Sequence, residues 1–596
     1  MRKRQTMVRG PGGGPLVAGA LAVALVGCRS KDDTDTAAPQ PPAAFSYVGE
    51  AALAALGSHH AADEGFTWGR SIDATLPEDW ILQVPEPWVW GEDVAVIEAD
   101  PTVVPGVTHQ EGEYHPDFLL PYCDSDSDCA VGTCAEVQAT VERVGDVPAS
   151  LCVGHSDGVW DAMYTVLASA QSYADLSSLD FPDNPAGTED VVEGRFLVAI
   201  RNALRFLDST GEPVEVRMMF GWLVNDFDWD QLLPIRVDTL TEGISEDTAL
   251  RLWVGGMNVD LLSWNHSKII AADGERLLQG GINFYSGDYL HASPVHDLSM
   301  LMEGEPARDG HRYLDAIWDA FVVDYDPGAL SDLDGTFTVL RTLPQGMDPP
   351  GASPYLTAEV APDDPEGTPV VSLGRLGLID RAGVVDPSPS DDGMLAAIDS
   401  AEESLRFVLQ DLGPVKDGVI VDVPGYGTVD LSYGWPERLM EILAWKAIDG
   451  VEVQIVISET GAGAYSYGWT KLELLEAWRD VIELDLELNG AAVEAAGSAT
   501  ALICDRIALA SPRVNDGDDT WSDGSAMGIH TKLWIVDDRA FYVGSQNMYI
   551  SNLFEWGLLV DDPQATADIL DVQWDPLWRY SSRSAVSGPG SSCILL

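Results

Sequence analysis

Two stretches of the chain carry the same polar residues at the same spacing. The first reads HSKIIAADGERLLQGGIN, and the second reads HTKLWIVDDRAFYVGSQN. The shared positions are His266, Lys268, Asp273, Gly280, Gly281 and Asn283 in the first stretch and His530, Lys532, Asp537, Gly544, Ser545 and Asn547 in the second. Both stretches fit the pattern H-x-K-x(4)-D-x(6)-G-[GS]-x-N without a gap. A pattern of this length that occurs twice in one chain indicates a duplicated functional unit.

The residue types of the pattern suit phosphate chemistry. Side chains at i and i+2 of a strand point to the same face, so His266 and Lys268 are expected to project together, as are His530 and Lys532. Lysine and asparagine side chains would donate to the non-bridging oxygens of a phosphate diester. One histidine would attack the phosphorus while the other protonates the leaving oxygen. The two stretches together therefore predict one nearly two-fold symmetric pocket for a phosphate.

The remaining shared positions are expected to shape a hairpin. Asp273-Gly274 is a favourable hairpin turn, and Asp537-Asp538 is a weaker one. We interpret the first aspartate of each turn as structural. The return strands are expected to end at Gly280-Gly281 and Gly544-Ser545, where small residues leave room for the backbone.

The elements around the two motifs are predicted to occur twice in the same order. Apolar spacing in the first half predicts helices and strands over 160–170, 173–179, 195–207, 214–220 and 250–254. The second half repeats this order over 392–402, 405–409, 436–448 and 451–457. Helices that alternate with short β-branched strands indicate α/β layers around a central sheet.

The paired motifs resemble those of the phospholipase D superfamily, which carries this HKD pattern twice. The resemblance covers residues 155–330 and 385–575. It implies two similar α/β/α sandwich domains packed around one shared active site, and a covalent phosphohistidine intermediate formed without a metal or other cofactor. It implies His266 as the nucleophile and His530 as the general acid, with the reverse assignment open. It also implies a downstream acid that orients each imidazole, for which Asp297 and Glu555 are the candidates.

These features divide the chain into segments with different expected roles. The segments are a lipoprotein signal peptide (1–28), a tether (29–45), an N-terminal extension with a Cys-rich knuckle (46–155), the first phospholipase D-like domain (156–340), a Pro-rich linker (341–384), the second such domain (385–580) and a tail (581–596). Two Gly- and Asp-rich segments, 412–435 and 506–527, are expected as insertions at the rim of the active site.

The N-terminus has the features of an export signal. A basic start is followed by the short apolar run 15–27, which ends at Leu-Val-Gly-Cys with Cys28 last. This ending resembles the bacterial lipobox, in which the cysteine is lipid-modified, and the alternative is a plain cleaved signal peptide. The protein is therefore expected to be exported and lipid-anchored to a bacterial membrane. The outer membrane is preferred because Arg29 stands where an inner-membrane retention signal has Asp.

Seven cysteines are present, and four of them cluster. Cys123, Cys129, Cys134 and Cys152 favour two disulfides in an exported chain, with their pairing undetermined. A zinc site is the alternative reading of this cluster. Cys504 and Cys593 remain without an assigned role.

The chain is strongly acidic, with 33 basic against 96 acidic residues and a formal net charge of -63. A field of this sign repels polyphosphate chains, which argues against nucleic acid as a partner. Together with this charge, the resemblance implies a monomer with internal pseudo-two-fold symmetry that hydrolyses phospholipids or another phosphodiester, or transfers phosphatidyl groups. A nuclease of the same superfamily and a cell-surface binding protein are the alternatives.

Overall fold

The computed structural model describes most of the chain beyond its N-terminus. The described residues are 44–98, 120, 122–129, 132–137, 140–141, 145–146, 149–183, 194–221, 229–259, 263–289, 293–324, 336–357, 364, 367–377, 388–413, 420–423, 427–430, 436–459, 462, 469–484, 486–549 and 553–595. The predicted signal peptide and Cys28 lie outside these residues. Within the described ranges, no helix combines the length and the apolar character needed to cross a bilayer.

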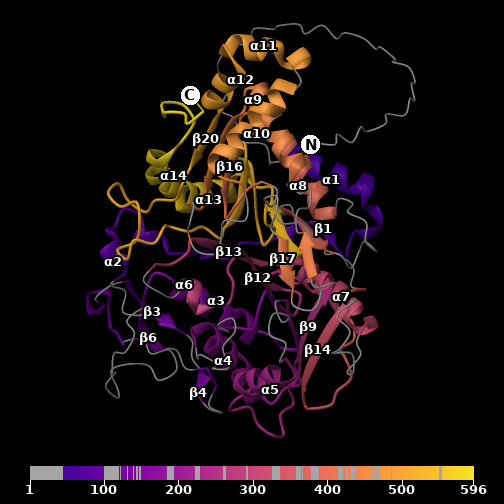
Figure 1. Ribbon diagram of the computed structural model, residues 1–596. Helices are drawn as coiled ribbons and strands as arrows, with labels where there is room; N and C mark the ends of the chain where they lie inside the picture. Colours follow the sequence, from indigo (N-terminus) through magenta and orange to yellow (C-terminus); the bar gives the residue numbers. More distant parts are fainter. Residues whose placement is uncertain are drawn as a thin grey trace, which may run out of the picture. The chain divides into compact units, whose positions relative to one another are not determined.

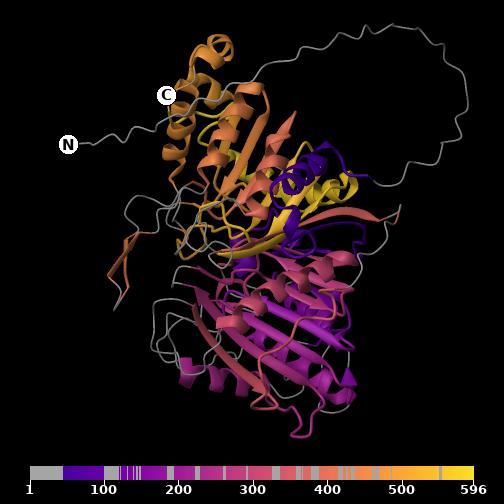
Figure 2. The ribbon, with the colours of Figure 1, turned by 90° about the vertical axis from the view of Figure 1, so that its right-hand side faces the viewer.

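The first half of the chain is organised around a mixed sheet (Figures 1 and 2). Its strands, in spatial order, are β10 (Ser263–Trp264), β9 (Arg251–Val259), β8 (Glu215–Phe220), β7 (Tyr173–Ser178), β11 (Ile269–Ala272), β12 (Arg276–Gly280), β13 (Asp297–Glu303) and β2 (Ile81–Val84), and β14 (Thr336–Leu343) also pairs with β9. The strands β7, β8 and β9 are parallel, and β11, β12 and β13 continue the sheet in antiparallel fashion.

The second half repeats this topology. Its sheet has the order β1 (Trp68–Ala74), β15 (Thr368–Leu376), β23 (Phe554–Val560), β22 (Ala540–Gly544), β21 (Lys532–Val536), β16 (Ser404–Leu409), β19 (Glu452–Ile457) and β20 (Ile507–Ala510). The strands β16, β19 and β20 are parallel, and β21, β22 and β23 are antiparallel, as their counterparts are in the first sheet. The predicted duplication of α/β units is therefore confirmed in strand order and direction.

Helices pack against both sheets, and a shared apolar core lies between the two halves. The helices are α1 (Tyr47–His59), α2 (Val94–Glu98), α3 (Asp157–Ala168), α4 (Arg195–Thr210), α5 (Trp229–Leu240), α6 (Ser286–Tyr289), α7 (Glu305–Asp324), α8 (Pro389–Asp399), α9 (Glu437–Asp449), α10 (Lys471–Leu484), α11 (Leu486–Ala496), α12 (Ala499–Arg506), α13 (Pro563–Ile569) and α14 (Asp575–Ser581), with a π-helical turn (Leu570–Trp574) between the last two. The helices α3 and α4 pack on the first sheet, while α8, α9 and α10 pack on the second. Apolar residues of both sheets and of α7 meet in the shared core, which stabilises the halves against each other.

The alternation of buried side chains explains how the motif strands hold this arrangement. In β11, Ile269 faces the shared core and Ile270 faces the outer core of the first half. In β21, Leu533 and Trp534 divide between the shared core and the outer core of the second half in the same way. Such strands are apolar on both faces because both faces are covered.

The N-terminal extension is built into both halves. Its strand β1 pairs with β15 at the edge of the second sheet, and its strand β2 pairs with β13 at the edge of the first. The helix α1 packs against α8, and the Ser46 hydroxyl donates to Asp561 at 2.6 Å. The residues 46–98 therefore complete both sheets instead of forming a separate body.

Three boundaries differ from the sequence prediction. The predicted linker 341–384 contains β15, whose apolar run TPVVSLGRL is buried between two neighbouring strands. The predicted insertion 506–527 begins with β20, a strand of the second sheet. The predicted tail 581–596 is held to the second half, because Val586 donates its N–H to Leu509 at 2.9 Å. In each case pairing with the sheet decides the structure, and a local sequence pattern does not report such pairing.

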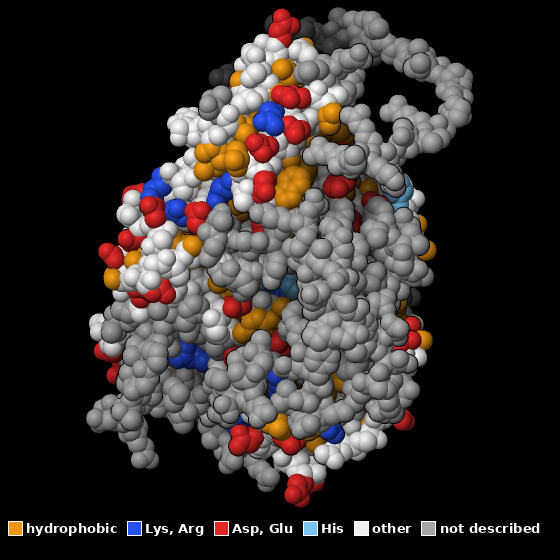
Figure 3. Space-filling model, viewed as in Figure 1, with side chains coloured by type: hydrophobic (Ala, Val, Ile, Leu, Met, Phe, Trp, Pro, Cys, Tyr) orange, Lys and Arg blue, Asp and Glu red, His pale blue; other side chains and the backbone are white. Residues whose placement is uncertain are grey.

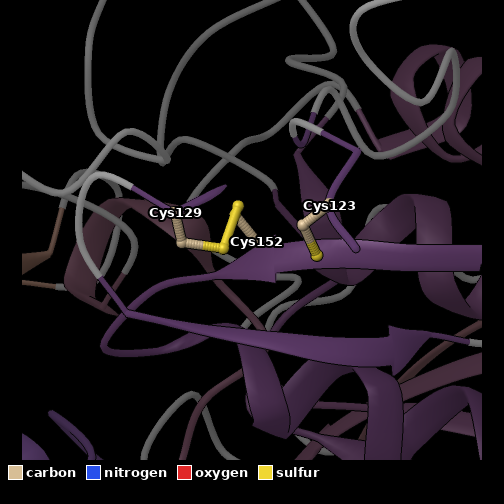
Figure 4. A group of neighbouring side chains, drawn as sticks. All are labelled: Cys123, Cys129 and Cys152. Carbon is tan, nitrogen blue, oxygen red and sulfur yellow. A yellow bond between two sulfur atoms is a disulfide. The ribbon is translucent and has the colours of Figure 1, made fainter. Parts of the chain in front are cut away.

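The Cys-rich knuckle contains two disulfides, as predicted. Cys123 bonds to Cys134, and Cys129 bonds to Cys152. Figure 4 shows the bond between Cys129 and Cys152, with Cys123 nearby. The short strands β3 (Thr133–Val137) and β6 (Ala149–Val153) align Cys134 with Cys152. Oxidised sulfurs are not thiolate ligands, so the alternative zinc site is wrong for this cluster.

A third disulfide was not predicted from the sequence. Cys504 in α12 bonds to Cys593 near the C-terminus, across 89 residues. Two cysteines that are far apart in the sequence give no local signal of their pairing. This bond fastens the C-terminal segment to the second half.

The lengths of the closed loops predict a ranking of stability losses. Replacing Cys504 and Cys593 with Ala should lower the free energy of unfolding by about 4 to 5 kcal/mol. The matched change of Cys123 and Cys134, which closes a loop with a separation of only 11 residues, should cost about 3 kcal/mol. Urea unfolding of the two double variants measures the difference. An equal or smaller loss for the 89-residue loop would contradict the ranking.

Candidate active site

Each motif folds into a hairpin whose turn contains the shared aspartate. The strands β11 and β12 are joined at Asp273 and Gly274, and β21 and β22 are joined at Asp537 and Asp538. All four of these residues have φ between 51° and 66°. This left-handed pair of central residues is that of a type I′ turn. The Asp-Asp pair, predicted to be the weaker turn, therefore adopts the same conformation as Asp-Gly.

The motif aspartates bind the start of the first strand of their own half. Asp273 accepts backbone N–H groups of Gln171 at 2.5 Å and of Ser172 and Tyr173, both at 3.0 Å. Asp537 accepts the equivalent backbone N–H groups of residues 402, 403 and 404 at 2.6–2.7 Å. These contacts anchor the hairpin turn to β7 in one half and β16 in the other. Both side chains have the structural contacts expected of them.

Each motif histidine lies before its strand, which corrects one detail of the prediction. β11 begins at Ile269 and β21 begins at Lys532, so both histidines occupy the irregular segment that leads into the hairpin. Each lysine turns back toward its own histidine, and its Nζ donates to the histidine carbonyl oxygen, at 2.7 Å for Lys268 and 2.5 Å for Lys532. A hydrogen bond to the histidine backbone is thus common to both pairs, and the two side chains do not share a strand face.

The two halves exchange the carboxylates that orient the histidines. His266 of the first half lies with Nδ1 2.9 Å from Glu555 Oε2 of the second half. His530 of the second half lies with Nδ1 2.7 Å from Asp297 Oδ2 of the first half. Each acid lies in the strand that follows the motif hairpin of its half. Asp297 is in β13, and Glu555 is in β23. Neither half therefore holds a complete histidine–carboxylate pair by itself.

The two imidazoles lie close together, edge to face, where the two halves meet. Their ring centroids are 6.3 Å apart, and each histidine is only 4% exposed. Figure 3 shows a hollow in one face of the molecule, with histidine and basic side chains visible at its bottom. With Nδ1 of each ring donating to a carboxylate, Nε2 carries the lone pair.

The two carboxylates are themselves held by different neighbours. The Ser545 hydroxyl donates to Glu555 Oε2 at 2.6 Å. The Tyr289 hydroxyl donates to Asp297 Oδ2 at 2.7 Å. The first motif has glycine where the second has Ser545, because a Cβ on Gly281 would lie 2.3 Å from Asp297 Oδ1. The [GS] position of the motif is therefore in contact with the carboxylate in both halves.

The motif asparagines follow the return strands and are buried. Asn283 and Asn547 are each 2% exposed. The backbone N–H of Asn283 donates to the Tyr289 hydroxyl at 3.0 Å. That hydroxyl also lies 3.4 Å from His530 Nδ1. Tyr289 therefore joins an asparagine, a carboxylate and a histidine of the two halves.

Electrostatics leave both imidazoles neutral. Burial lowers the pKa of His266 to about 4, although Glu555 opposes the shift. Burial and the nearby charge of Lys532 lower the pKa of His530 to about 3. Burial raises the pKa values of Asp297 and Glu555, but the imidazoles that donate to them bring both below their usual range. A neutral, oriented imidazole beside a carboxylate is suited to nucleophilic attack.

The lysines bring positive charge to the same space. Burial lowers the pKa of Lys532 to about 8 and, together with the charge of Lys532, holds the pKa of Lys268 well below its usual range. Two ammonium groups in one buried site favour an anion between them, because an anion relieves both their desolvation and their repulsion. The site therefore combines an anion-binding region with two histidines on opposite sides.

Sequence reasoning missed the contribution of Tyr289. Tyr289 lies in the short helix α6 between Asn283 and Asp297, and its place in the chain is the one signal that pointed to it. His296 accepts the His530 N–H at its carbonyl oxygen, at 2.7 Å, and its Nδ1 lies 2.9 Å from Thr531 Oγ1. His291, another histidine of this segment, lies outside the described residues.

Comparison with known proteins gives one similarity in sequence and several in structure. No family model matches the chain. The chain is 28% identical over 476 residues to phospholipase D of Streptomyces antibioticus. The aligned region covers 72% of this chain and 78% of that protein. A phosphatidylserine synthase from Haemophilus influenzae Rd KW20 aligns with a TM-score of 0.40 and 15% identity, over 71% of this chain and 84% of the other. Nuc, a phospholipase D family member from Salmonella typhimurium, aligns with a TM-score of 0.19 and 19% identity, over 31% and 85%.

The depressed histidine pKa values predict a loss of stability in mild acid. His266, His296 and His530 have folded pKa values of about 4, 4 and 3, below the ordinary value of 6.5. Between pH 6.5 and the folded pKa of each ring, the unfolded chain binds a proton that the folded protein does not bind. The free energy of unfolding therefore falls as the pH falls. Each histidine should remove about 2 kcal/mol between pH ~6.5 and pH ~5. Urea unfolding at several pH values measures the slope.

His296 provides the control for this slope because its side chain is not part of a histidine–carboxylate pair. In His296→Asn the fall in unfolding free energy over the same pH range should be smaller by about 2 kcal/mol, the contribution of one histidine. An unchanged slope in this variant, or a wild-type protein that gains stability on acidification, would contradict the assignment.

Proposed function

We propose that the protein is a phosphodiesterase of the phospholipase D type, which hydrolyses phospholipids or transfers their phosphatidyl groups. The observation that carries this proposal is the pair of exchanged histidine–carboxylate contacts, at 2.9 Å and 2.7 Å, around a space that two buried lysines line. Two oriented bases on opposite sides of an anion site match a two-step displacement at phosphorus.

His266 is the better candidate for the nucleophile. Its Nδ1 is engaged by Glu555, and no hydrogen-bond partner of its Nε2 is found among the described residues. In contrast, Lys532 Nζ lies 3.0 Å from Nε2 of His530. The lone pair of His266 Nε2 is therefore available for attack, whereas the lone pair of His530 Nε2 lies against the Lys532 ammonium group.

His530 then serves as the general acid. The charge of Lys532 is one cause of its depressed pKa, after burial. A bound phosphodiester anion offsets this charge, so substrate binding raises the pKa of His530 toward the range in which the ring carries a proton. Asp297 stabilises the resulting imidazolium through the contact with Nδ1.

The proposed reaction has two balanced steps. His266 Nε2 attacks phosphorus, the bond to the head-group oxygen breaks, and that oxygen takes a proton from His530. Water or an alcohol then gives a proton to His530 while its oxygen attacks phosphorus, and the bond between phosphorus and His266 breaks. Lys268, Lys532, Asn283 and Asn547 would bind the non-bridging oxygens in both steps.

Phospholipid is the substrate class that the charge and the sequence similarity favour. The Streptomyces antibioticus protein that is 28% identical is a phospholipase D. A net charge of -63 disfavours nucleic acid. We further propose that a lipid on Cys28 tethers the protein to a bacterial membrane, which would keep it beside its substrate.

The function is tested by turnover of defined phosphodiesters in the presence of EDTA. Labelled phosphatidylcholine and phosphatidylglycerol should release their head groups, and plasmid DNA should remain intact. His266→Ala and His530→Ala should each lower kcat by at least about a thousandfold, because each removes a group that takes part in bond making or breaking. His296→Asn is the matched control outside the two pairs and should retain most of its activity.

Each alternative gives a different result in the same experiment. Cleavage of DNA without turnover of lipid would identify a nuclease, and loss of activity in EDTA would contradict a metal-free reaction. Activity that survives both His→Ala substitutions would refute the site. Turnover of none of the three substrates would favour a binding protein.

A further inference from the structure

A buried arginine, Arg375, lies near the second motif and has no role in the proposed reaction. Arg375 lies in β15 and is fully buried. In the antiparallel pairing of β15 with β23, Arg375 is directly opposite Glu555. Side chains directly opposite each other project from the same face of a sheet. Arg375 is thus the cross-strand neighbour of the residue that orients His266.

Arg375 holds the start of α8 through Asp391. Its guanidinium forms an ion pair with the Asp391 carboxylate, which is also largely buried. The guanidinium Nε donates to the hydroxyl of Ser388, the N-cap residue of α8, at 3.4 Å. Burying a lone carboxylate is costly, so the arginine is the charge that permits Asp391 to stand here.

Asp391 in turn fixes the residue between Ser545 and Asn547 of the second motif. Gln546 donates its amide Nε2–H to Asp391 Oδ1 at 2.7 Å. Its amide oxygen accepts the Ser390 hydroxyl, so neighbouring α8 residues hold both ends of the amide. Gln546 is fully buried and has no freedom to find other partners.

The two neighbours of Gln546 belong to the site. Ser545, which precedes it, donates to Glu555 Oε2 at 2.6 Å and accepts the N–H of Trp556 at 3.0 Å. Asn547, which follows it, is the motif asparagine. A shift of Gln546 would therefore move both the group that holds Glu555 and the proposed phosphate ligand.

The first half holds the matching segment without any charge. Ile282 takes the position of Gln546 between Gly281 and Asn283, and it packs in the apolar core of the first half. The side chain at this position is thus anchored by apolar packing in one half and by a buried charge network in the other. The network is an addition to the second half and not a requirement of the fold.

We propose that Arg375 is a positioning residue for the second half of the active site. Through Asp391 and Gln546 it fixes the backbone of Ser545 and Asn547, and through Ser545 it sets the contact between Glu555 and His266. This inference rests on the proposed function for its effect on catalysis, but its structural part does not. Arg375 does not touch the substrate and acts only through these neighbours.

The test compares Arg375→Met and Gln546→Met with a control in the first half. Arg217 is also a fully buried arginine, paired with Asp175 and Asp315, and none of these contacts reaches a motif histidine or asparagine. Arg217→Met therefore removes an equivalent buried cation without disturbing the path to Asn547. Arg375→Lys keeps the charge and should restore part of the function.

Three readouts separate positioning from stability. Hydrogen exchange of the segment 544–548 should accelerate in Arg375→Met and Gln546→Met, while the segment 280–284 stays unchanged. The affinity for orthovanadate, a phosphate-shaped anion, should fall about tenfold, and kcat on phosphatidylcholine should fall by about a hundredfold with a smaller change in KM. The double variant should lose no more than the larger single loss, because both residues act along one path.

The outcomes distinguish this inference from the proposed function. The role of Arg375 would be overturned if Arg375→Met accelerated hydrogen exchange equally in the segments 544–548 and 280–284. It would also be overturned if this variant kept the vanadate affinity of the wild-type protein. An equal loss of affinity in Arg217→Met would do the same. A wild-type protein that neither binds vanadate nor turns over phospholipid would refute the proposed function, while the exchange data would still decide whether Arg375 holds the segment.

Discussion

Each buried imidazole of the site depends on a carboxylate that the other half of the chain supplies. A histidine that is only 4% exposed loses most of its hydration, and the acid opposite restores a hydrogen bond and fixes the tautomer. Because Glu555 and Asp297 come from opposite halves, these contacts exist only when the two sheets pack correctly. The shared core and the N-terminal strands, which pair with both sheets, hold that packing. The packing that stabilises the fold is thus also the packing that sets the geometry of the site.

The two halves meet this constraint with the same topology and different supports. Tyr289 holds the acid of the first half, whereas Ser545 and the network behind it hold the acid of the second. Lys532 contacts both ring nitrogens of His530, while Lys268 contacts the backbone of His266. A duplicated fold with two chemically different histidines suits the proposed two-step displacement, in which one ring would attack and the other would carry the proton.

Much of this arrangement could be predicted from the sequence because it is local. The paired motifs, the hairpins and the alternation of helices with strands follow from spacing within short windows. The strand β1, the bond between Cys504 and Cys593 and the role of Tyr289 could not be predicted, since each depends on a partner far away in the chain. For the same reason the sequence named Asp297 and Glu555 without assigning them to the opposite histidines. The role of Arg375 could not be predicted either, because an arginine in an apolar strand can be interpreted only once its partner Asp391 is known.

The proposed covalent intermediate can be tested directly by rapid acid or alkaline quenching with a phosphate-labelled phospholipid, followed by mapping of the labelled peptide. We expect one labelled histidine per chain, at His266, in the wild-type protein. In Glu555→Gln the label should form more slowly at the same residue, because the imidazole loses the charge that orients it. Label at His530, label at both histidines, or stoichiometric turnover with no labelled histidine under any quench would contradict the account.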